Sequence, residues 1–241
     1  MPNLKGYGRK RKFIKRRRFT ARARKSVDQR GSLNNPNVGY TTPLTARLPF
    51  PAHMRVVSIY SQPGTLTTGS SVFGAEQRFR LNSVYDPDYT GAGHTVRGYS
   101  ILSGIYQQYR VTKVHYQVIF TTPGSANDIQ CALTVAPNTS GSLGSANSFF
   151  PAEYAGGSFG VLSSAGERRC ILQGTIDMAK LCGVTHTKYN ADDVFSSYIG
   201  ASPVQLALLS IATCCMDGTN GVTCAVQTTL SYETEWFDRL V

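Results

Sequence analysis

The clearest structural signal in the chain is a strict alternation of side chains over residues 222–236. Apolar or small side chains recur at every second position, apart from Thr234: Val222, Cys224, Val226, Thr228, Leu230, Tyr232 and Trp236. Polar side chains fill most of the intervening positions: Thr223, Gln227, Thr229, Ser231, Glu233 and Glu235. A period of two is typical of a β-strand with one buried face, so this stretch predicts a long strand that covers a core.

Seven further segments show strand patterns bounded by turn residues. They are His53–Ser61, Gln77–Val84, Arg110–Thr121, Asp128–Ala136, Glu167–Thr175, Thr185–Asn190 and Val204–Cys215. Eight strands in one compact domain favour an all-β fold, an eight-stranded antiparallel jelly-roll sandwich. The segment Val204–Cys215 is apolar on both faces toward its end, which predicts a central position in its sheet or a subunit contact.

The connections between these segments are rich in turn residues. Asp217–Gly221 reads as a hairpin that joins the last strand to the preceding one. Helical signal is sparse, with a turn or two expected at Ser100–Tyr109, Ser148–Ala155 and Ile176–Leu181. The glycine-rich pieces read as surface loops because none has the strand-then-helix context of a phosphate-binding loop: Gly64–Gly74, Gly91–Gly98 and Gly156–Gly166.

The positive charge of the chain is concentrated at its N-terminal end. The formal net charge is +11, yet residues 1–30 hold thirteen Lys and Arg against one acid, Asp28, which gives this segment +12. The remaining residues carry twelve basic and thirteen acidic groups, a balance of −1. The sequence therefore predicts a near-neutral body with a cationic arm, and it places nucleic-acid binding in the arm.

Residues 1–31 form this predicted arm. Its basic residues are Lys5, Arg9, Lys10, Arg11, Lys12, Lys15, Arg16, Arg17, Arg18, Arg22, Arg24, Lys25 and Arg30. Tyr7, Phe13 and Phe19 interrupt the charge, and aromatic rings among cations suit a single strand, since rings stack on unpaired bases while cations neutralise phosphates. So few apolar residues cannot offset ordering entropy, which predicts disorder in the free arm.

The densest part of the arm also matches a nuclear localisation signal. Its basic residues are Lys10, Arg11, Lys12, Lys15, Arg16, Arg17 and Arg18. A merely solvated tail is the alternative for the arm. A linker rich in Pro, Asn, Gly and Thr follows over residues 32–52, and the sandwich domain is expected over 53–241. No apolar run is long enough to cross a membrane, and no apolar stretch of a secretory signal follows the basic N-terminus.

Signatures of catalysis and of cofactor or metal binding are weak. The histidines His53, His94, His115 and His186 are far apart and form no metal-binding spacing. The adjacent acids Asp86 with Asp88, and Asp192 with Asp193, fall short of the oxygen ligands that Ca²⁺ needs, so a turn role is favoured. Three basic residues of the strands could extend the basic lining of the arm or simply be solvated: Arg78, Arg80 and Lys113.

Six scattered cysteines read as buried thiols in a reducing compartment, with disulfides as the less favoured alternative: Cys131, Cys170, Cys182, Cys214, Cys215 and Cys224.

The stretch from Arg78 to Phe120 carries a family resemblance. It holds Phe79-Arg80-Leu81-Asn82, Tyr85-Asp86-Pro87-Asp88, Thr90-Gly91-Ala92-Gly93-His94, Gly98-Tyr99, and Tyr106 and Tyr109 before a strand. This series resembles the capsid proteins of small circular single-stranded DNA viruses that encode a replication initiator, the circovirus-like group. Thr95-Val96 departs from the Gln-Pro that is more usual after the histidine.

The resemblance implies a structural protein with no catalytic role and no cofactor. It implies self-assembly of about sixty subunits into a T=1 icosahedral virion, packaging of a single-stranded DNA genome, host nuclear import machinery as a partner, a host receptor of unknown identity, and a nuclear stage during assembly. Other classes stay open from the residues alone. They are the capsid protein of a small RNA virus, a non-viral nucleic-acid-binding β-sandwich oligomer, and an enzyme with an unfamiliar site.

Overall fold

Strands make up most of the chain that the computed structural model describes, which is residues 50–68, 76–122, 127–137, 158–216 and 221–240. All of these residues belong to one compact unit, Arg47–Val241. Residues 1–46 lie outside the described residues.

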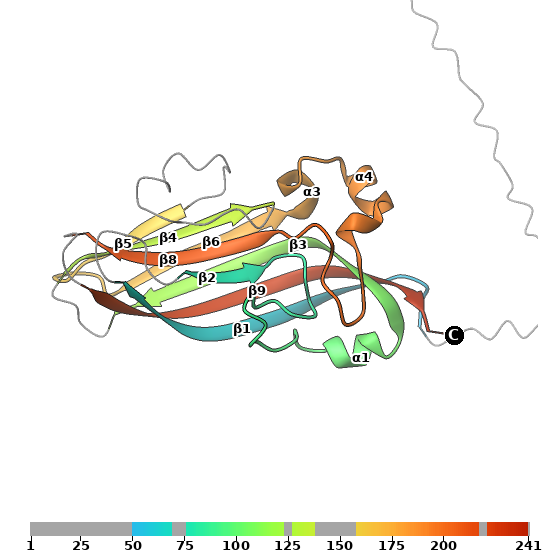
Figure 1. Cartoon of the computed structure of the whole chain (residues 1–241), viewed down its shortest axis with the longest axis horizontal. Helices are drawn as coiled ribbons and strands as arrows, with labels where there is room; N and C mark the ends of the chain where they lie inside the picture. Colours follow the sequence, from blue (N-terminus) through green and yellow to red (C-terminus); the bar gives the residue numbers. More distant parts are fainter. Residues whose placement is uncertain (1–49, 69–75, 123–126, 138–157, 217–220, 241) are drawn as a thin grey trace, which may run out of the picture. The chain divides into compact units, whose positions relative to one another are not determined.

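Two antiparallel sheets lie one over the other (Figure 1). The first sheet has the order β1-β9-β3-β6, with the short β7 paired to β3. Its strands are β1 (Met54–Thr68), β9 (Val222–Arg239), β3 (Tyr106–Thr121), β6 (Arg169–Asp177) and β7 (Ser197–Tyr198). The second sheet has the order β2-β8-β4-β5. Its strands are β2 (Gln77–Arg80), β8 (Leu208–Cys215), β4 (Ile129–Ala136) and β5 (Ser158–Leu162).

The connectivity confirms the predicted jelly roll. Leaving aside β7, the chain passes from one sheet to the other at every step except between β4 and β5, which are neighbours in the second sheet. All pairs are antiparallel. Eight strands wound in this way between two sheets define a jelly roll. The strand β8 lies inside its sheet, between β2 and β4, as its two apolar faces predict.

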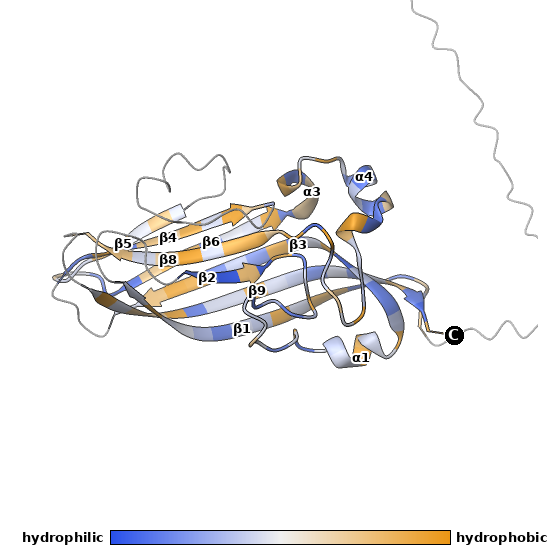
Figure 2. Ribbon diagram, in the orientation of Figure 1, coloured by the Kyte–Doolittle hydropathy of each residue, from blue (hydrophilic) through white to orange (hydrophobic). Residues whose placement is uncertain are grey.

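The core fills the space between the sheets. From β9 the predicted inward face is buried at every position, including Leu230, Tyr232 and Trp236, each with 0% exposure. Side chains of β3, β4 and β8 meet them in one continuous cluster, and Figure 2 shows long hydrophobic stretches on β4 and β8. Tyr232 also crosses the core, because its hydroxyl donates to the Arg80 carbonyl oxygen of β2 at 2.8 Å.

Short helices occupy the connections. They are α1 (Tyr99–Ser103), α3 (Met178–Leu181), α4 (His186–Ala191) and the 3₁₀ helix η2 (Asp193–Phe195). The helical turns predicted near Ser100–Tyr109 and Ile176–Leu181 are present, although the first is shorter because β3 already begins at Tyr106. The helix predicted at Ser148–Ala155 lies outside the described residues.

The prediction of a strand at Thr185–Asn190 is wrong, because this segment forms α4. Thr185 caps the helix, since its Oγ1 accepts a hydrogen bond from the Lys188 backbone N–H at 3.2 Å. The capped helix places the Tyr189 side chain in the core, where its hydroxyl donates to the Val111 carbonyl oxygen at 2.7 Å. An alternating pattern this short does not distinguish a strand from a capped helical turn.

Two glycine-rich segments predicted as loops contain strand. Strand β5 lies within Gly156–Gly166, and β1 continues through Pro63 and Gly64 to Thr68. The proline is tolerated because β1 is an edge strand that pairs only with β9, so a missing N–H can face away from the ladder. Conversely, the strand predicted at Gln77–Val84 ends at Arg80.

The predicted hairpin between β8 and β9 is also wrong. These consecutive strands lie in different sheets, so the connection crosses the sandwich instead of folding back within one sheet. Residues 217–220 of that connection lie outside the described residues. The strand patterns on both sides fit a hairpin and a crossing equally well.

Truncation of a β9 core side chain tests this architecture. We expect Leu230→Ala to lower the free energy of unfolding by about 2–5 kcal/mol, because it removes a fully buried side chain between the sheets. Thr223→Ala, on the exposed face of the same strand, is the matched control and should change it by less than about 1 kcal/mol. Chemical denaturation of both variants measures the difference. Equal small effects would contradict the assigned faces.

Candidate nucleic-acid interface and motif network

The predicted nucleic-acid-binding residues and the predicted nuclear localisation signal all lie in residues 1–30, outside the described residues. They stay predictions. Four of the eleven described Lys and Arg side chains of the body are paired with carboxylates of described residues. The pairs are Arg55–Glu235 (3.7 Å), Arg78–Glu76 (2.5 Å), Arg80–Asp86 (2.6 Å) and Lys113–Glu233 (3.7 Å).

Arg80 is therefore not part of a basic lining. Its guanidinium Nη1 donates to Asp86 Oδ2, to the Asp86 carbonyl oxygen at 3.0 Å and to the Asp88 carbonyl oxygen at 2.7 Å. It also stacks on the Tyr89 ring at 5.2 Å from the centroid. Arg80 thus holds the loop that follows β2. Arg78 contacts the same ring, and Lys113 is half-buried beside Glu233.

The Asp-Pro-Asp sequence has the predicted turn role. Asp88 Oδ1 accepts hydrogen bonds from the Thr90 N–H (2.9 Å) and hydroxyl (2.8 Å), and Oδ2 accepts one from Gln62 Nε2 (2.9 Å). The guanidinium of Arg80 occupies the position beside Asp86 that a cation would need. Asp192 likewise caps a turn, because its Oδ1 accepts from the Val194 N–H at 3.1 Å.

The environment of Asp88 favours its charged form. Burial alone would raise the pKa of this carboxyl, but the hydrogen bonds from Gln62 and Thr90 and the nearby Arg80 guanidinium outweigh burial and hold the pKa below its usual range. Gln62 is held in turn by the hydroxyl of Tyr60, which donates to Gln62 Oε1. The network thus joins β1 to the loop after β2.

Asn82 makes the corresponding link to the segment before β8. Its Nδ2 donates to the Gln205 carbonyl oxygen at 2.6 Å, and its Oδ1 accepts from the Ala207 N–H at 3.1 Å. The side chain is 1% exposed, and both of its polar groups are satisfied by backbone, as a buried amide requires. An aspartate or leucine could not satisfy both partners.

The Thr-Gly-Ala-Gly-His sequence packs this loop against β1. A Cβ at Gly93 would lie 2.5 Å from Asp88 Cβ and 2.7 Å from Tyr60 Oη, so only glycine fits. The His94 ring then contacts the Tyr60 ring at a centroid distance of 4.5 Å. Gly98 adopts the left-handed φ of 85° before α1. The quoted motif residues thus hold the fold together around one loop.

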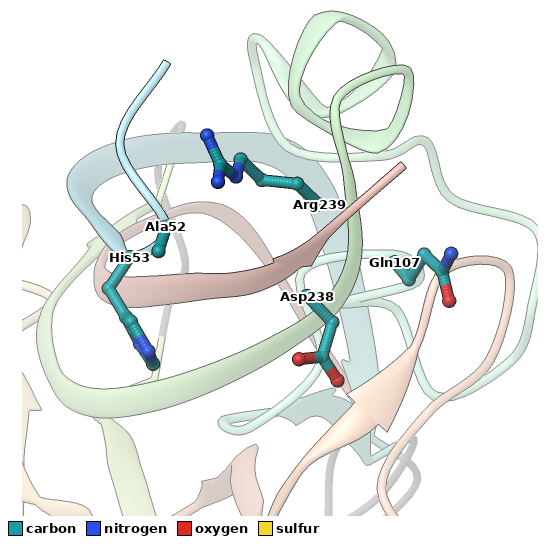
Figure 3. Close-up of a pocket in the computed structure, with 5 residues that line it drawn as sticks. All are labelled: Ala52, His53, Gln107, Asp238 and Arg239. Atoms are coloured by element: carbon teal, nitrogen blue, oxygen red, sulfur yellow. The ribbon is translucent and has the colours of Figure 1, made fainter. Parts of the chain in front are cut away.

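Residues 50 and 51, which precede β1, are held at the start of β3 and the end of β9. Tyr106 donates its hydroxyl to the Pro51 carbonyl oxygen at 3.0 Å, and Arg239 Nη1 donates to the Phe50 carbonyl oxygen at 2.8 Å. Beside these anchors is an open hollow of about 410 Å³, lined by Ala52, His53, Gln107, Asp238 and Arg239. Figure 3 shows Asp238 and Arg239 extending from opposite sides of the end of β9.

These anchor residues were missed by sequence reasoning. Tyr106 and Arg239 are far from residues 50 and 51 in the chain, and no local pattern connects them. The structure brings them together because β3 and β9 are adjacent and antiparallel, so β3 begins at the end of the sheet where β9 ends. The hollow holds one carboxylate, one guanidinium and one imidazole, so it has no strong excess of either charge.

The exposed face of the first sheet carries a second, polar hollow of about 490 Å³, formed mainly by amide and hydroxyl side chains of β3, β6 and β9. His115 lies there, exposed as predicted. Its Nε2 is 3.0 Å from Glu233 Oε1, and its Nδ1 is 2.7 Å from Thr175 Oγ1. The hydrogen bond with His115 and the charge of Lys113 lower the pKa of the Glu233 carboxyl. His94 lies on a loop, also as predicted.

The described ranges contain neither a cluster of metal ligands nor a membrane-spanning helix. No group of three or more His, Cys, Asp or Glu side chains is placed there to hold a metal ion. Within the same ranges, no helix combines the length and the apolar character of a membrane span. All six cysteines are free thiols, four of them buried and two, Cys170 and Cys182, partly buried.

Comparison with known proteins gives structural likenesses only. No protein-family model matches the chain, and no curated protein matches its sequence. A solved structure of mud crab tombus-like virus is 9% identical, with a TM-score of 0.47, and the match covers 86% of this chain and 96% of that one. A capsid protein deletion mutant of Penaeus vannamei nodavirus, in a T=1 subviral particle, is 10% identical with a TM-score of 0.45, covering 78% and 98%.

A structure of turnip yellow mosaic virus is 12% identical, with a TM-score of 0.41 and coverage of 79% and 97%. These three TM-scores are all below 0.5. The fold assignment therefore rests on the strand order of this chain and not on these likenesses.

Removal of the Asp88 charge tests the motif network. We expect Asp88→Asn to lower the free energy of unfolding at pH 7 by about 1–3 kcal/mol, because the amide cannot accept all three hydrogen bonds. The native carboxyl has a lowered pKa in the folded state, so its contribution is present above its unfolded pKa of about 3.9 and is lost as the pH falls through the folded value.

The difference between the native protein and this variant should therefore be largest near pH 7 and should shrink below about pH 4. Chemical denaturation at pH 7, 5 and 3 measures it. Asp193→Asn, which changes an exposed carboxyl, is the control and should show no such trend. A pH-independent difference for Asp88→Asn would contradict the electrostatic role.

Proposed function

We propose that this protein is a viral capsid protein that assembles into a closed shell and packages single-stranded nucleic acid. The observation that carries the proposal is the separation of charge between the two parts of the chain. A jelly-roll body of nearly neutral charge follows, along the chain, an N-terminal segment of +12. Jelly rolls also serve as lectins and cupins. A cupin-like metal site needs a ligand cluster, and the described residues provide none.

The physical logic follows from the charge. Confining one nucleic-acid strand inside a shell is opposed by repulsion between phosphates, and a segment of +12 per subunit offsets part of that repulsion. The body has little net charge of its own, so copies can approach one another without strong repulsion. In this proposal the protein acts through binding and assembly and catalyses no reaction.

The finer assignment to a circular single-stranded DNA virus is supported by the motif series between Phe79 and Tyr109. In that assignment the genome is single-stranded DNA, the shell has about sixty copies and T=1 symmetry, and the basic residues between Lys10 and Arg18 engage the host nuclear import machinery. The virion and, during assembly, the host nucleus are then its locations. The charge argument applies equally to RNA, which leaves an RNA virus capsid as the alternative.

Particle mass tests the assembly proposal. At near-physiological salt we expect a light-scattering mass near sixty times 26.2 kDa, about 1.6 MDa before cargo, with excess absorbance at 260 nm. A clean peak of one to ten subunits would instead favour a nucleic-acid-binding oligomer. Reassembly with equal lengths of circular single-stranded DNA and single-stranded RNA, followed by nuclease digestion, separates the genome assignments. Preferential RNA uptake would overturn the DNA assignment alone.

Salt dependence tests the role of the N-terminal segment. If all twelve net charges contact phosphates, log K for a single strand should fall with log salt at a slope of about −8. Changing the seven basic residues between Lys10 and Arg18 to Gln should reduce the slope to about −3 to −4. Lys180→Gln with Lys188→Gln, on the exposed surface of the body, is the control and should leave it unchanged. The reverse result would place binding on the body.

A further inference from the structure

Between the two sheets, the thiol of Cys131 contacts two other cysteine thiols, those of Cys170 and Cys224. Cys131 belongs to β4 in the second sheet, while Cys170 of β6 and Cys224 of β9 belong to the first. Their side chains all join the core cluster. Cys131 and Cys224 have 0% exposure, whereas Cys170 is only partly buried and lies on an edge strand. Cys170 is thus the residue of the cluster that is partly open to solvent.

A glycine opens the space through which Cys170 reaches Cys131. Gly160 of β5 is the direct partner of Cys131 in the strand register. A Cβ on Gly160 would overlap the Sγ of Cys170, and its next neighbours would be Leu172 Cδ2 at 3.6 Å and Cys170 Cβ at 3.9 Å. The thiol of Cys170 therefore lies against the backbone of the residue beside Cys131. Any larger residue at position 160 would push the two cysteines apart.

The hydrogen bonds give the three thiols different roles. The Cys131 thiol is hydrogen bonded to Cys170 and Cys224, and these bonds together with burial raise its pKa. The bond from Cys131 also lowers the pKa of Cys170 to about 7 against the effect of burial. The hydrogen bond with Cys131 lowers the pKa of Cys224 as well, but Cys224 has 0% exposure, so solutes do not reach its thiol. Cys170 is then the thiol that ionises near neutral pH.

We propose that Cys170 is a modification site for peroxides, and that Cys131 resolves its oxidised form into a disulfide that joins the two sheets. In the first step the Cys170 thiolate attacks one peroxide oxygen, the O–O bond breaks, and the departing hydroxide takes up a proton to leave as water. In the second step Cys131 sulfur attacks the sulfenic acid, the S–O bond breaks, and hydroxide leaves with the Cys131 proton as water. Two thiols and one hydrogen peroxide thus give one disulfide and two waters.

The other thiols are less suited to this reaction. Burial raises the pKa of Cys182, and burial with the neighbouring Cys215 raises that of Cys214 to about 11. A thiol that stays protonated reacts slowly with peroxide. Selectivity for Cys170 should therefore follow from its hydrogen bond with Cys131 and its partial exposure together.

Peptide mapping of the full-length protein tests the proposal. After treatment with a few equivalents of hydrogen peroxide at pH 7.5 and digestion with trypsin without reduction, peptides 114–168 and 170–180 should be joined, two hydrogens lighter than their sum. Each of these peptides holds one cysteine, so the linkage is unambiguous. Dithiothreitol should separate them. A linkage of 170–180 to 189–239, a link between subunits, or no link at all would overturn the proposal.

Three variants separate the roles. With Cys131→Ala, Cys170 should stop at the sulfenic acid, which dimedone traps. Gly160→Ala should reduce the yield of the cross-link at least several-fold, although every cysteine is kept. Cys182→Ser, a partly buried cysteine outside the cluster, is the control and should leave the map unchanged. An unchanged yield in Gly160→Ala would contradict the geometry argued here.

The disulfide should also stabilise the body. It closes a covalent loop between residues 131 and 170 and restricts the unfolded chain, so the thermal midpoint should rise by roughly 5–10 °C. The rise should disappear in dithiothreitol and in Cys170→Ser. A lower midpoint after oxidation would mean that the cross-link distorts the sandwich, and it would exclude a stabilising disulfide.

Discussion

The burial of β9 between β1 and β3, with its inward side chains packed on the second sheet, is the constraint on which the rest of the structure depends. β9 pairs along nearly its whole length with both neighbours, and each of its inward side chains is buried. Apolar burial supplies the main driving force of folding. The polar link from Tyr232 to the Arg80 carbonyl oxygen then fixes how the second sheet lies over the first.

The motif region completes the sandwich on one side. Arg80, Asp88 and Asn82 each bind backbone or side chains of a different segment, so the loop after β2 is tied both to β1 and to the segment before β8. Their hydrogen-bonding groups are satisfied mainly within the chain. A residue used in this way has little capacity left for a ligand. The sequence series that resembles the capsid proteins of small DNA viruses therefore has a structural explanation in this protein.

The sequence predicted the strands whose alternation was long, and it failed where structure depends on partners far away in the chain. Residues 222–236 show their buried face directly, and β9 follows it. Thr185–Asn190 alternates too briefly, and the cap by Thr185 makes it a helix. Gly160 was predicted to lie in a loop, yet it is a strand residue whose missing side chain makes room for Cys170. No local pattern could reveal that neighbour.

The candidate site divides in the same way. The charge of the N-terminal segment is evident from sequence, because it depends only on composition. The cationic side chains of the body were harder to interpret from sequence. Arg80 could bind phosphates or stabilise its own loop, and only the position of Asp86 in the structure decides between the two. The anchors at residues 50 and 51 depend on the pairing of β3 with β9, two strands that lie far apart in the chain.

These anchors bear on protein engineering. Phe50 is bound by Arg239, and the backbone N–H of Leu240 donates to the Ile105 carbonyl oxygen at 2.9 Å. Phe50 and Pro51 at the start of the body therefore lie beside the end of β9 and the start of β3. A cargo domain fused after residue 240 would leave the body beside Phe50. A displayed epitope is better inserted elsewhere, because a fusion at that position would crowd the contacts that hold Phe50 and Pro51.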